Sequence, residues 1–191
     1  MGIFAKLLSG QRSRTRTNTF QDPFRIANPR IGFLNLQAAQ GATLAEADRR
    51  VLSPLFKISN ASTDIAPKCE VLFVYCTLGA DGRITGYPDS LRDTIRSAGA
   101  YIAIVASENP AATYKDALKP PNGWHANIAF VVDRKGDNFA LFFRRLFELM
   151  LGGRSMPMAW NDLAPQIPGH DHSGMPGAMM IAEAGHVTLD G

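Results

Sequence analysis

The sequence predicts an α/β domain with a doubly wound, mostly parallel five-stranded sheet and helices on both of its faces. Short β-rich apolar segments alternate with helical patterns from residue 31 onward. One of these segments, CEVLFVYC (69–76), is apolar almost throughout, as expected for a central strand that is buried on both faces. Because parallel strands are joined by right-handed crossovers that usually contain a helix, this alternation favours a parallel sheet.

Five strands are expected in this sheet, in the order 2-1-3-4-5. Each is a short β-rich run that is bounded by Gly, Pro or polar residues. The predicted strands are residues 31–37, 69–76, 100–107, 127–133 and 155–160. Near the C-terminus, MMIAE and HVTLD flank Ala184-Gly185, which predicts either a terminal hairpin or one bent strand.

The first helical pattern covers residues 43–59. Thr43 and Glu46 have the spacing of a capping box, in which each side chain binds a backbone N–H of the first turn. Pro54 lacks the N–H that a helix interior needs, so we expect it to break or kink this helix.

Three further helices are predicted downstream. Residues 88–99 begin with Pro in the first turn and end on Gly99, where a C-cap glycine belongs. A short helix is expected near 109–118. Residues 136–153 form the clearest helical pattern, because apolar residues recur at the i, i+3, i+4, i+7 spacing and indicate a core-facing stripe: Phe139, Phe142, Phe143, Leu146, Phe147 and Met150.

The chain divides into three parts. We predict a basic N-terminal arm (1–30), an α/β domain (31–164), and a C-terminal loop and hairpin (165–191) that packs on the domain or extends it. The arm contains the polar basic run QRSRTRTNT. Two interpretations of it stay open: a loosely packed segment, or a tether to an anionic membrane surface or to nucleic acid.

Composition limits the class of protein. The 191 residues are 46% hydrophobic and 19% charged, which is typical of a globular domain with a buried core. A net charge of +3 is too small to indicate a general nucleic-acid binder. No apolar run approaches the ~20 residues that span a bilayer. The two cysteines, Cys69 and Cys76, are poorly spaced for a disulfide or a metal site, so a reduced, cytoplasmic location is expected.

Polar residues follow all five predicted strands. In open parallel sheets, ligands bind beyond the carboxyl ends of the strands, near the point where the strand order reverses. Any fold of this kind turns polar there, but a carboxylate, a hydroxyl, amides and a thiol at one edge favour a binding site. The candidate ligand-binding residues at these ends are Gln37, Thr77, Ser107, Asn109, Asp133 and Asn161.

Glu108 and Cys76 are the candidate catalytic residues. Glu108 follows a buried strand, where partial burial would raise its pKa and suit it to acid–base catalysis. The alternative is structural: Ser107 or Asn109 caps the next helix and Glu108 complements its dipole. Cys76 would be a nucleophile if a base such as His125 lay within reach, and otherwise a buried structural cysteine.

Two further motifs are weaker indications of a binding site. The glycine-rich stretch TLGADGRITGY (77–87) has neither GxGxxG nor a P-loop pattern, although Arg83 within it would suit an anionic ligand. The HDH motif at 170–172 lacks the spacing of zinc sites, and no metal is predicted.

The middle of the chain carries a family resemblance. TLGADGRITGY is the loop after the second strand, SLRDTIRSAG a helix, AYIAIVAS a strand that closes on Ser, and ENPAATYKDAL a helix entered through a polar turn. In this order, residues 77–118 resemble a TIR (Toll/interleukin-1 receptor) domain, which is flavodoxin-like. The resemblance implies NAD chemistry. Enzymatic members carry a glutamate in the helix after the third strand, where the nearest acid here is Asp116, and the first strand ends in LNLQ instead of SY.

Two functions are therefore expected from different classes. The first is an α/β domain that binds a nucleotide-type small ligand, with NAD or another nucleotide as the cofactor and a role in NAD processing or nucleotide sensing in bacterial signalling or defence. The second is a non-catalytic module that self-associates into a homo-oligomer. The apolar stretch MPGAMMIA near the C-terminus favours the second function, because it would suit a subunit interface.

Overall fold

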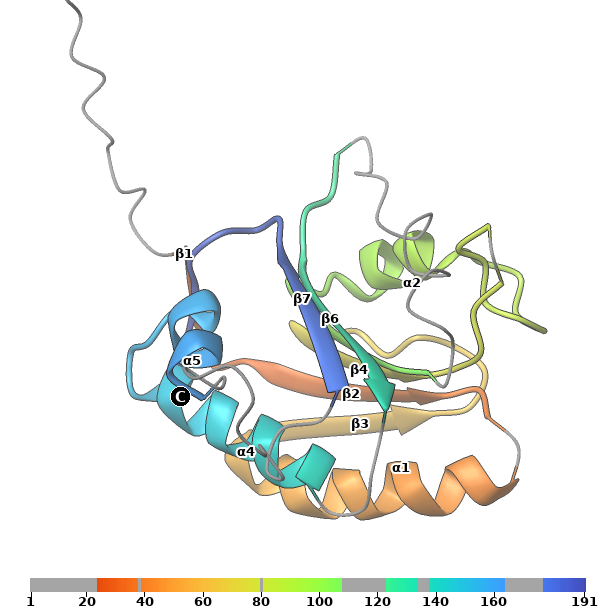
Figure 1. Cartoon of the computed structure of the whole chain (residues 1–191), viewed down its shortest axis with the longest axis horizontal. Helices are drawn as coiled ribbons and strands as arrows, with labels where there is room; N and C mark the ends of the chain where they lie inside the picture. The colour runs from red at the N-terminus through yellow and green to blue at the C-terminus, as the bar shows by residue number, and fades with distance from the viewer. Residues whose placement is uncertain (1–23, 38, 80, 108–122, 134–137, 164–176) are drawn as a thin grey trace, which may run out of the picture.

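A six-stranded, mostly parallel sheet forms the centre of the fold (Figure 1). The computed structural model describes residues 24–37, 39–79, 81–107, 123–133, 138–163 and 177–191. Across the sheet the strands are β3 (Ile58–Ser62), β2 (Arg30–Asn35), β4 (Val71–Tyr75), β5 (Ile102–Ala106), β6 (Asn127–Asp133) and β7 (Gly177–Ala182). The first five are parallel, and β7 is antiparallel to β6.

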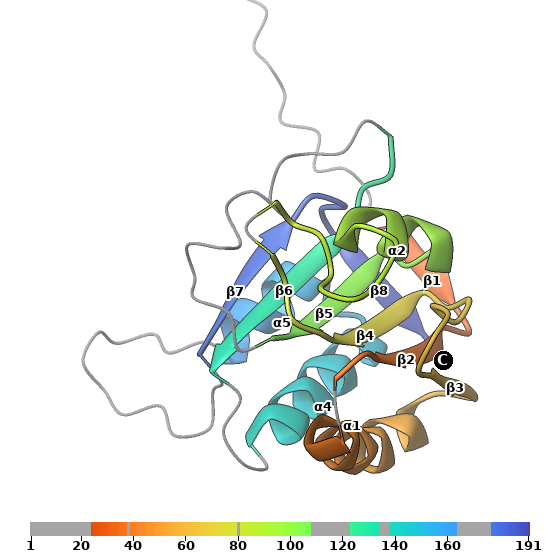
Figure 2. The ribbon, with the colours of Figure 1, turned by 90° about the vertical axis from the view of Figure 1, so that its right-hand side faces the viewer.

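Helices cover both faces of the sheet (Figure 2). One face carries α1 (Ala39–Leu52), α4 (Asn138–Leu151) and α5 (Met156–Leu163), and the other carries α2 (Leu91–Ala98). A separate parallel pair, β1 (Phe24–Ala27) with β8 (Val187–Asp190), packs on the α4 side. In the described residues no helix combines the length and apolar character needed to cross a bilayer.

Aromatic packing joins α4 to the sheet. Phe73 of β4 meets Phe139, Phe143 and Phe147 edge to face, with ring centroids 5.7–6.1 Å apart. Edge-to-face contacts of this kind stabilise the core beyond the area they bury. The predicted helix 136–153 is thus confirmed as α4, with its aromatic stripe in the core.

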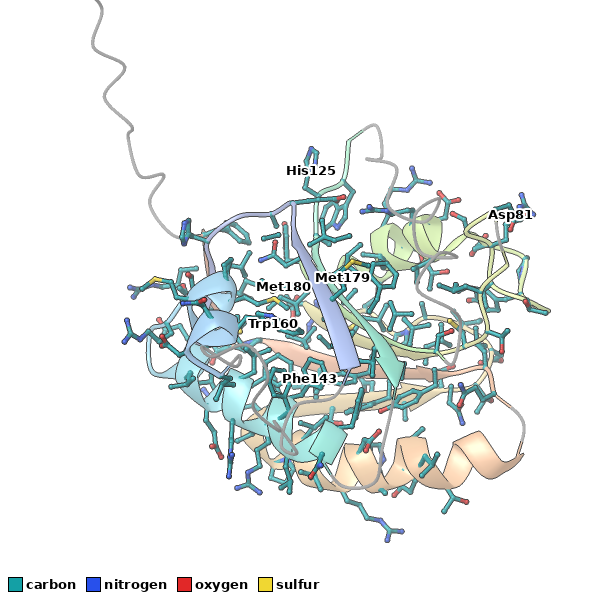
Figure 3. The ribbon with its side chains drawn as sticks, in the orientation of Figure 1. Asp81, His125, Phe143, Trp160, Met179 and Met180 are labelled. Atoms are coloured by element: carbon teal, nitrogen blue, oxygen red, sulfur yellow. The ribbon has the colours of Figure 1, made fainter. Side chains whose placement is uncertain are left out.

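The strand β7 places its side chains alternately in the two layers. Met180 packs with the α4 and α5 core, to which Trp160 also belongs, whereas Met179 packs with the α2 core (Figure 3). This alternation is the period of two that a strand imposes. The described part of the apolar stretch near the C-terminus is therefore a half-buried strand at one edge of the sheet, in contact with both layers.

The helix predicted at 88–99 is confirmed as α2. The Ser90 side chain accepts a hydrogen bond from the Asp93 N–H, and Gly99 ends the helix with φ 77°. A left-handed residue at this position favours glycine, which has no Cβ to clash.

Two predicted elements have different boundaries or a different type. The helix predicted at 43–59 ends at Leu52, where a 3-10 turn (Ser53–Leu55) that contains Pro54 leads into strand β3. The strand predicted at 155–160 is helix α5, because Pro157 lies in the first turn, where no backbone N–H is needed. The predicted sheet therefore keeps four of its five strands, and β3 and β7 complete it.

The predicted C-terminal hairpin is wrong, because β7 and β8 belong to different sheets. Side chains from β6 and α2 bind the turn between β7 and β8. The Asn127 side-chain amide donates to the Gly185 carbonyl (2.9 Å) and accepts from the Ala184 N–H (3.0 Å). Arg92 of α2 forms a bidentate pair with Glu183 in which both distances are 2.6 Å. These contacts direct the chain out of the large sheet.

The last residues of the predicted N-terminal arm (1–30) include a strand. Residues 24–27 are β1, and β2 begins at Arg30, where Glu70 binds both the backbone N–H (2.8 Å) and the guanidinium group. Residues 1–23 of the predicted arm lie outside the described residues.

The chain crosses over β2 at Gly32. Because β2 lies between β3 and β4, the segment after β3 must pass over β2 to reach β4. Pro67 and Cys69 of this segment pack directly on Gly32. A Cβ on Gly32 would lie 2.5 Å from Cys69 Sγ and 2.7 Å from Pro67 Cγ, so a larger residue does not fit.

We expect Gly32→Ala to lower the free energy of unfolding by about 1–3 kcal/mol, because the added methyl group overpacks this crossing. Chemical denaturation monitored by circular dichroism measures the change. Cys69→Ala removes one of the two clashing groups, so the double variant should lose less than the sum of the two single losses. If Gly32→Ala were as stable as the wild type, the close packing of Pro67 and Cys69 on Gly32 would be contradicted.

Candidate functional site

A pocket of about 320 Å³ lies at the carboxyl ends of β2 and β3, beneath α1. The pocket lies next to the point where the strand order reverses. From β2 the chain goes to β3 on one side and then to β4 on the other side. Its lining residues are Phe33, Asn35, Ala45, Glu46, Arg49, Ala61, Ser62 and Thr63. Pockets in open α/β sheets bind ligands at this kind of position.

The strands supply the floor of the pocket. Phe33 and Asn35 share one face of β2, because alternate residues of a strand point the same way. Ala61 of β3 is the register partner of Phe33, so it lies on the same face. Asn35 also ends the strand: its Oδ1 accepts a hydrogen bond from the Gln37 N–H (3.1 Å), which turns the chain toward α1.

The helix α1 supplies a charged wall. Glu46 accepts hydrogen bonds from Arg49 at both oxygens (2.7 and 2.9 Å) and from Arg50 Nε at Oε1 (3.2 Å). The hydrogen bond from Arg49 outweighs desolvation and lowers the pKa of Glu46 to about 2. Glu46 is therefore ionised at neutral pH, and its ion pairs weaken only as the pH falls below the ordinary value of 4.5 toward 2.

The chain after β3 closes the far side of the pocket with a local turn. The Ser62 hydroxyl donates to Asp64 Oδ1 (2.8 Å) and accepts from the Ile65 N–H (3.2 Å). Ser62 is thus occupied within its own turn, while the neighbouring Thr63 is exposed at the rim.

A buried polar pair adjoins the pocket. The Tyr75 hydroxyl donates to Asp48 Oδ2 of α1 at 2.9 Å, and both residues are at most 2% exposed. Tyr75 is the register partner of Asn35, so this pair lies beside the pocket on the same face of the sheet. The pair fixes α1 over the carboxyl ends of β2 and β4.

Four of the predicted ligand-binding residues, Gln37, Thr77, Ser107 and Asp133, lie at or just beyond the carboxyl ends of the strands. Gln37 is half-buried, and its backbone N–H donates to Oδ1 of the pocket residue Asn35. Thr77 is exposed and Ser107 is buried. Asp133 ends β6. The predicted Glu108 and Asn109 lie outside the described residues, and none of the predicted residues is among the described ones that line the pocket.

Cys76 lies on the opposite face of the sheet from the pocket. Its side chain is packed in the α2 core, and burial raises the pKa of its thiol to about 12. A thiol that stays protonated at neutral pH is a poor nucleophile. Cys76 is therefore not part of the pocket. Ser107 lies on the same face of the sheet as Cys76, because side chains alternate along a strand and Ala106 is the register partner of Tyr75.

The loop that carries Arg83 packs on the α2 face as well. Leu78 and Ile84 are buried there, and the Gly79 N–H donates to the Arg83 carbonyl (2.8 Å). Figure 3 shows Asp81 projecting at the tip of this loop. Arg83 is exposed and is not among the residues that line the pocket. Its contact with an anionic ligand therefore stays a prediction.

Asn161 was predicted at a strand end, and its position is corrected. It is exposed on α5, which Figure 1 shows beside the end of α4 that lies away from the carboxyl edge. The reason is that residues 155–160 are helical.

Metal-binding side chains do not cluster in the part of the chain that the structure describes: no three His, Cys, Asp or Glu residues lie close enough to hold an ion. The HDH motif is outside the described residues. His186 is hydrogen-bonded through Nδ1 to the Ser155 hydroxyl (3.0 Å).

The pocket residues were missed for two reasons. Asn35 falls inside the strand predicted at 31–37, so its position at a strand end was hidden. Ala61, Ser62 and Thr63 follow a helix predicted to run to residue 59, which concealed strand β3. A polar Asn just before the run LQAAQG was the one available signal of the edge.

Comparison with protein-family models, with curated proteins and with solved structures found no match to this chain.

We expect Tyr75→Phe to destabilise the protein by about 1–3 kcal/mol, because it removes a buried hydrogen bond to a carboxylate and leaves Asp48 with one donor fewer. Urea denaturation measures the loss. Tyr87→Phe, at a half-buried tyrosine of the loop before α2, is the control and should stay within ~0.5 kcal/mol of wild type. Equal stability of the two variants would show that the buried pair contributes nothing.

Proposed function

We propose that this chain is a small-ligand-binding α/β domain whose ligand is of nucleotide type. The observation that carries the proposal is the pocket beneath α1, which lies at the carboxyl edge beside the reversal of strand order. Binding sites of open parallel sheets occur at such switch points.

The chemistry of the lining supports this ligand class. Phe33 and Ala61 of the strands form an apolar floor, and Ala45 of α1 adds an apolar contact opposite them, which together suit a flat ring. Around it stand an amide, hydroxyl groups and a carboxylate–guanidinium pair, which suit the polar groups of a base and a sugar.

The proposal includes a flavodoxin-like, TIR-related architecture. The parallel strands β3-β2-β4-β5-β6 stand in the order 2-1-3-4-5 when they are counted along the chain from β2. The resemblance of residues 77–118 to TIR domains supports NAD as one member of the ligand class, and it supports a role in bacterial signalling or defence.

Self-association is a second candidate function, and the edge of the sheet at β3 favours it. In the described chain β3 pairs only with β2, and its sequence ISNAS has no charge or proline to block a further strand. Ile58 and Ile65 beside this edge are 49% and 71% exposed. Apolar residues at an open strand edge favour pairing with a second copy.

Ligand binding predicts a rise in melting temperature with at least one nucleoside, mononucleotide or dinucleotide such as NAD. Ala61→Phe should abolish that rise, because the added ring fills the pocket from an exposed position. Asn60→Phe is the matched control, since Asn60 is exposed on the same strand but on its other face. Thermal-shift measurements check this, with product analysis for NAD turnover. The absence of a shift with every compound would remove the proposal.

Self-association predicts a molar mass that rises with concentration in light scattering. Ile65→Lys should restore the monomer, because it places a charge beside the β3 edge. Leu141→Lys is the control on α4, where the leucine is 48% exposed. A strict monomer at all concentrations would argue against this second function.

A further inference from the structure

The polar groups of the pocket differ in their capacity for new hydrogen bonds. Ser62 is occupied by its own turn, where it donates to Asp64. Asn35 uses one oxygen lone pair on the Gln37 N–H, and its Nδ2 donors have no partner among the described residues. The Thr63 hydroxyl is likewise without a partner in the described part of the chain. An amide and a hydroxyl are therefore open to the edge of a base.

Glu46 has remaining acceptor capacity as well. Its carboxylate offers about four lone-pair sites. Arg49 Nε occupies one site on Oε2, while Arg49 Nη2 and Arg50 Nε share Oε1. The Arg50 contact is the longest at 3.2 Å, and the Arg50 side chain is 76% exposed. One ligand hydroxyl would take the open site on Oε2, and a second would replace Arg50 on Oε1.

The charges around the pocket balance. Arg49 and Arg50 face Glu46, and Asp64 adds a second carboxylate through Ser62. The described surroundings therefore hold no surplus positive charge for a chain of phosphates. The volume of about 320 Å³ is also near the lower limit of the ~300–1,000 Å³ that small-molecule sites span.

From these observations we infer that the pocket takes a single ribonucleoside unit, and that Glu46 accepts hydrogen bonds from the 2′- and 3′-hydroxyl groups of its ribose. A carboxylate held by an arginine fork is a fixed, ionised acceptor, which is the strong kind for neighbouring hydroxyl donors. This inference rests on the proposed function, because it names the ligand of the same pocket.

Isothermal titration calorimetry tests the inference with adenosine, guanosine, cytidine and uridine. The nucleoside that binds most tightly is then compared with its 2′,3′-dideoxy form and with free ribose. We expect the dideoxy form to bind about tenfold more weakly or worse, because it lacks both donors to an ionised acceptor. Free ribose should bind more weakly than the nucleoside, because it leaves the apolar floor empty.

The variant Glu46→Gln should reduce the ratio of dideoxy to ribonucleoside dissociation constants to about threefold or less. Glu148→Gln is the matched control. Glu148 is a half-exposed glutamate of α4 that pairs with Arg144 at 2.9 Å, so its loss affects a similar helix surface away from the pocket. This control should keep the full ratio.

Three results would overturn the inference. Equal affinity for the ribo and dideoxy forms, with binding still blocked by Ala61→Phe, would reject the role of Glu46 and leave the proposed function standing. NAD or ATP binding more than about tenfold tighter than its parent nucleoside would reject the single-unit site in the same way. Binding of no nucleoside or nucleotide at all would remove the proposed function and the inference together.

Discussion

The crossing of the chain over β2 is the constraint on which the rest of the fold depends. Pro67 and Cys69 pack on the backbone of Gly32 at a distance that excludes any side chain. The contact lies where the chain passes from β3, on one side of β2, to β4 on the other side. The strand order then reverses at β2, and α1 is left above the carboxyl ends of β2 and β3. The pocket is a consequence of that arrangement.

Strand alternation divides the carboxyl edge into two chemically different faces. Asn35 and Tyr75 point to the α1 face, where the pocket and the buried Asp48 lie. Cys76 points to the α2 face, into apolar surroundings that raise the pKa of its thiol to about 12. Two neighbours in sequence, Tyr75 and Cys76, therefore have unrelated environments. A position at a strand end does not by itself place a side chain in a site.

The sequence predicted the elements whose signal is local and strong. The buried strands β4 and β5, the aromatic helix α4 and the capped helix α2 were all predictable, because burial, periodicity and caps are written in adjacent residues. The exposed edge strand β3 was not predicted, since ISNAS lacks apolar alternation and obtains its structure from pairing with β2. The pocket depends on β3, so it could not be predicted either.

The small sheet has a mechanical consequence. The strands β1 and β8 come from distant parts of the described chain, yet they pair in parallel from Phe24 beside Val187 to Ala27 beside Asp190. Backbone bonds extend the pairing at each end, from the Phe24 N–H to His186 (2.8 Å) and from the Asn28 N–H to Asp190 (2.6 Å). A force that pulls Phe24 and Asp190 apart therefore acts along the strands and loads these bonds together. Stretched from these two residues, the domain would resist by shear instead of unzipping bond by bond.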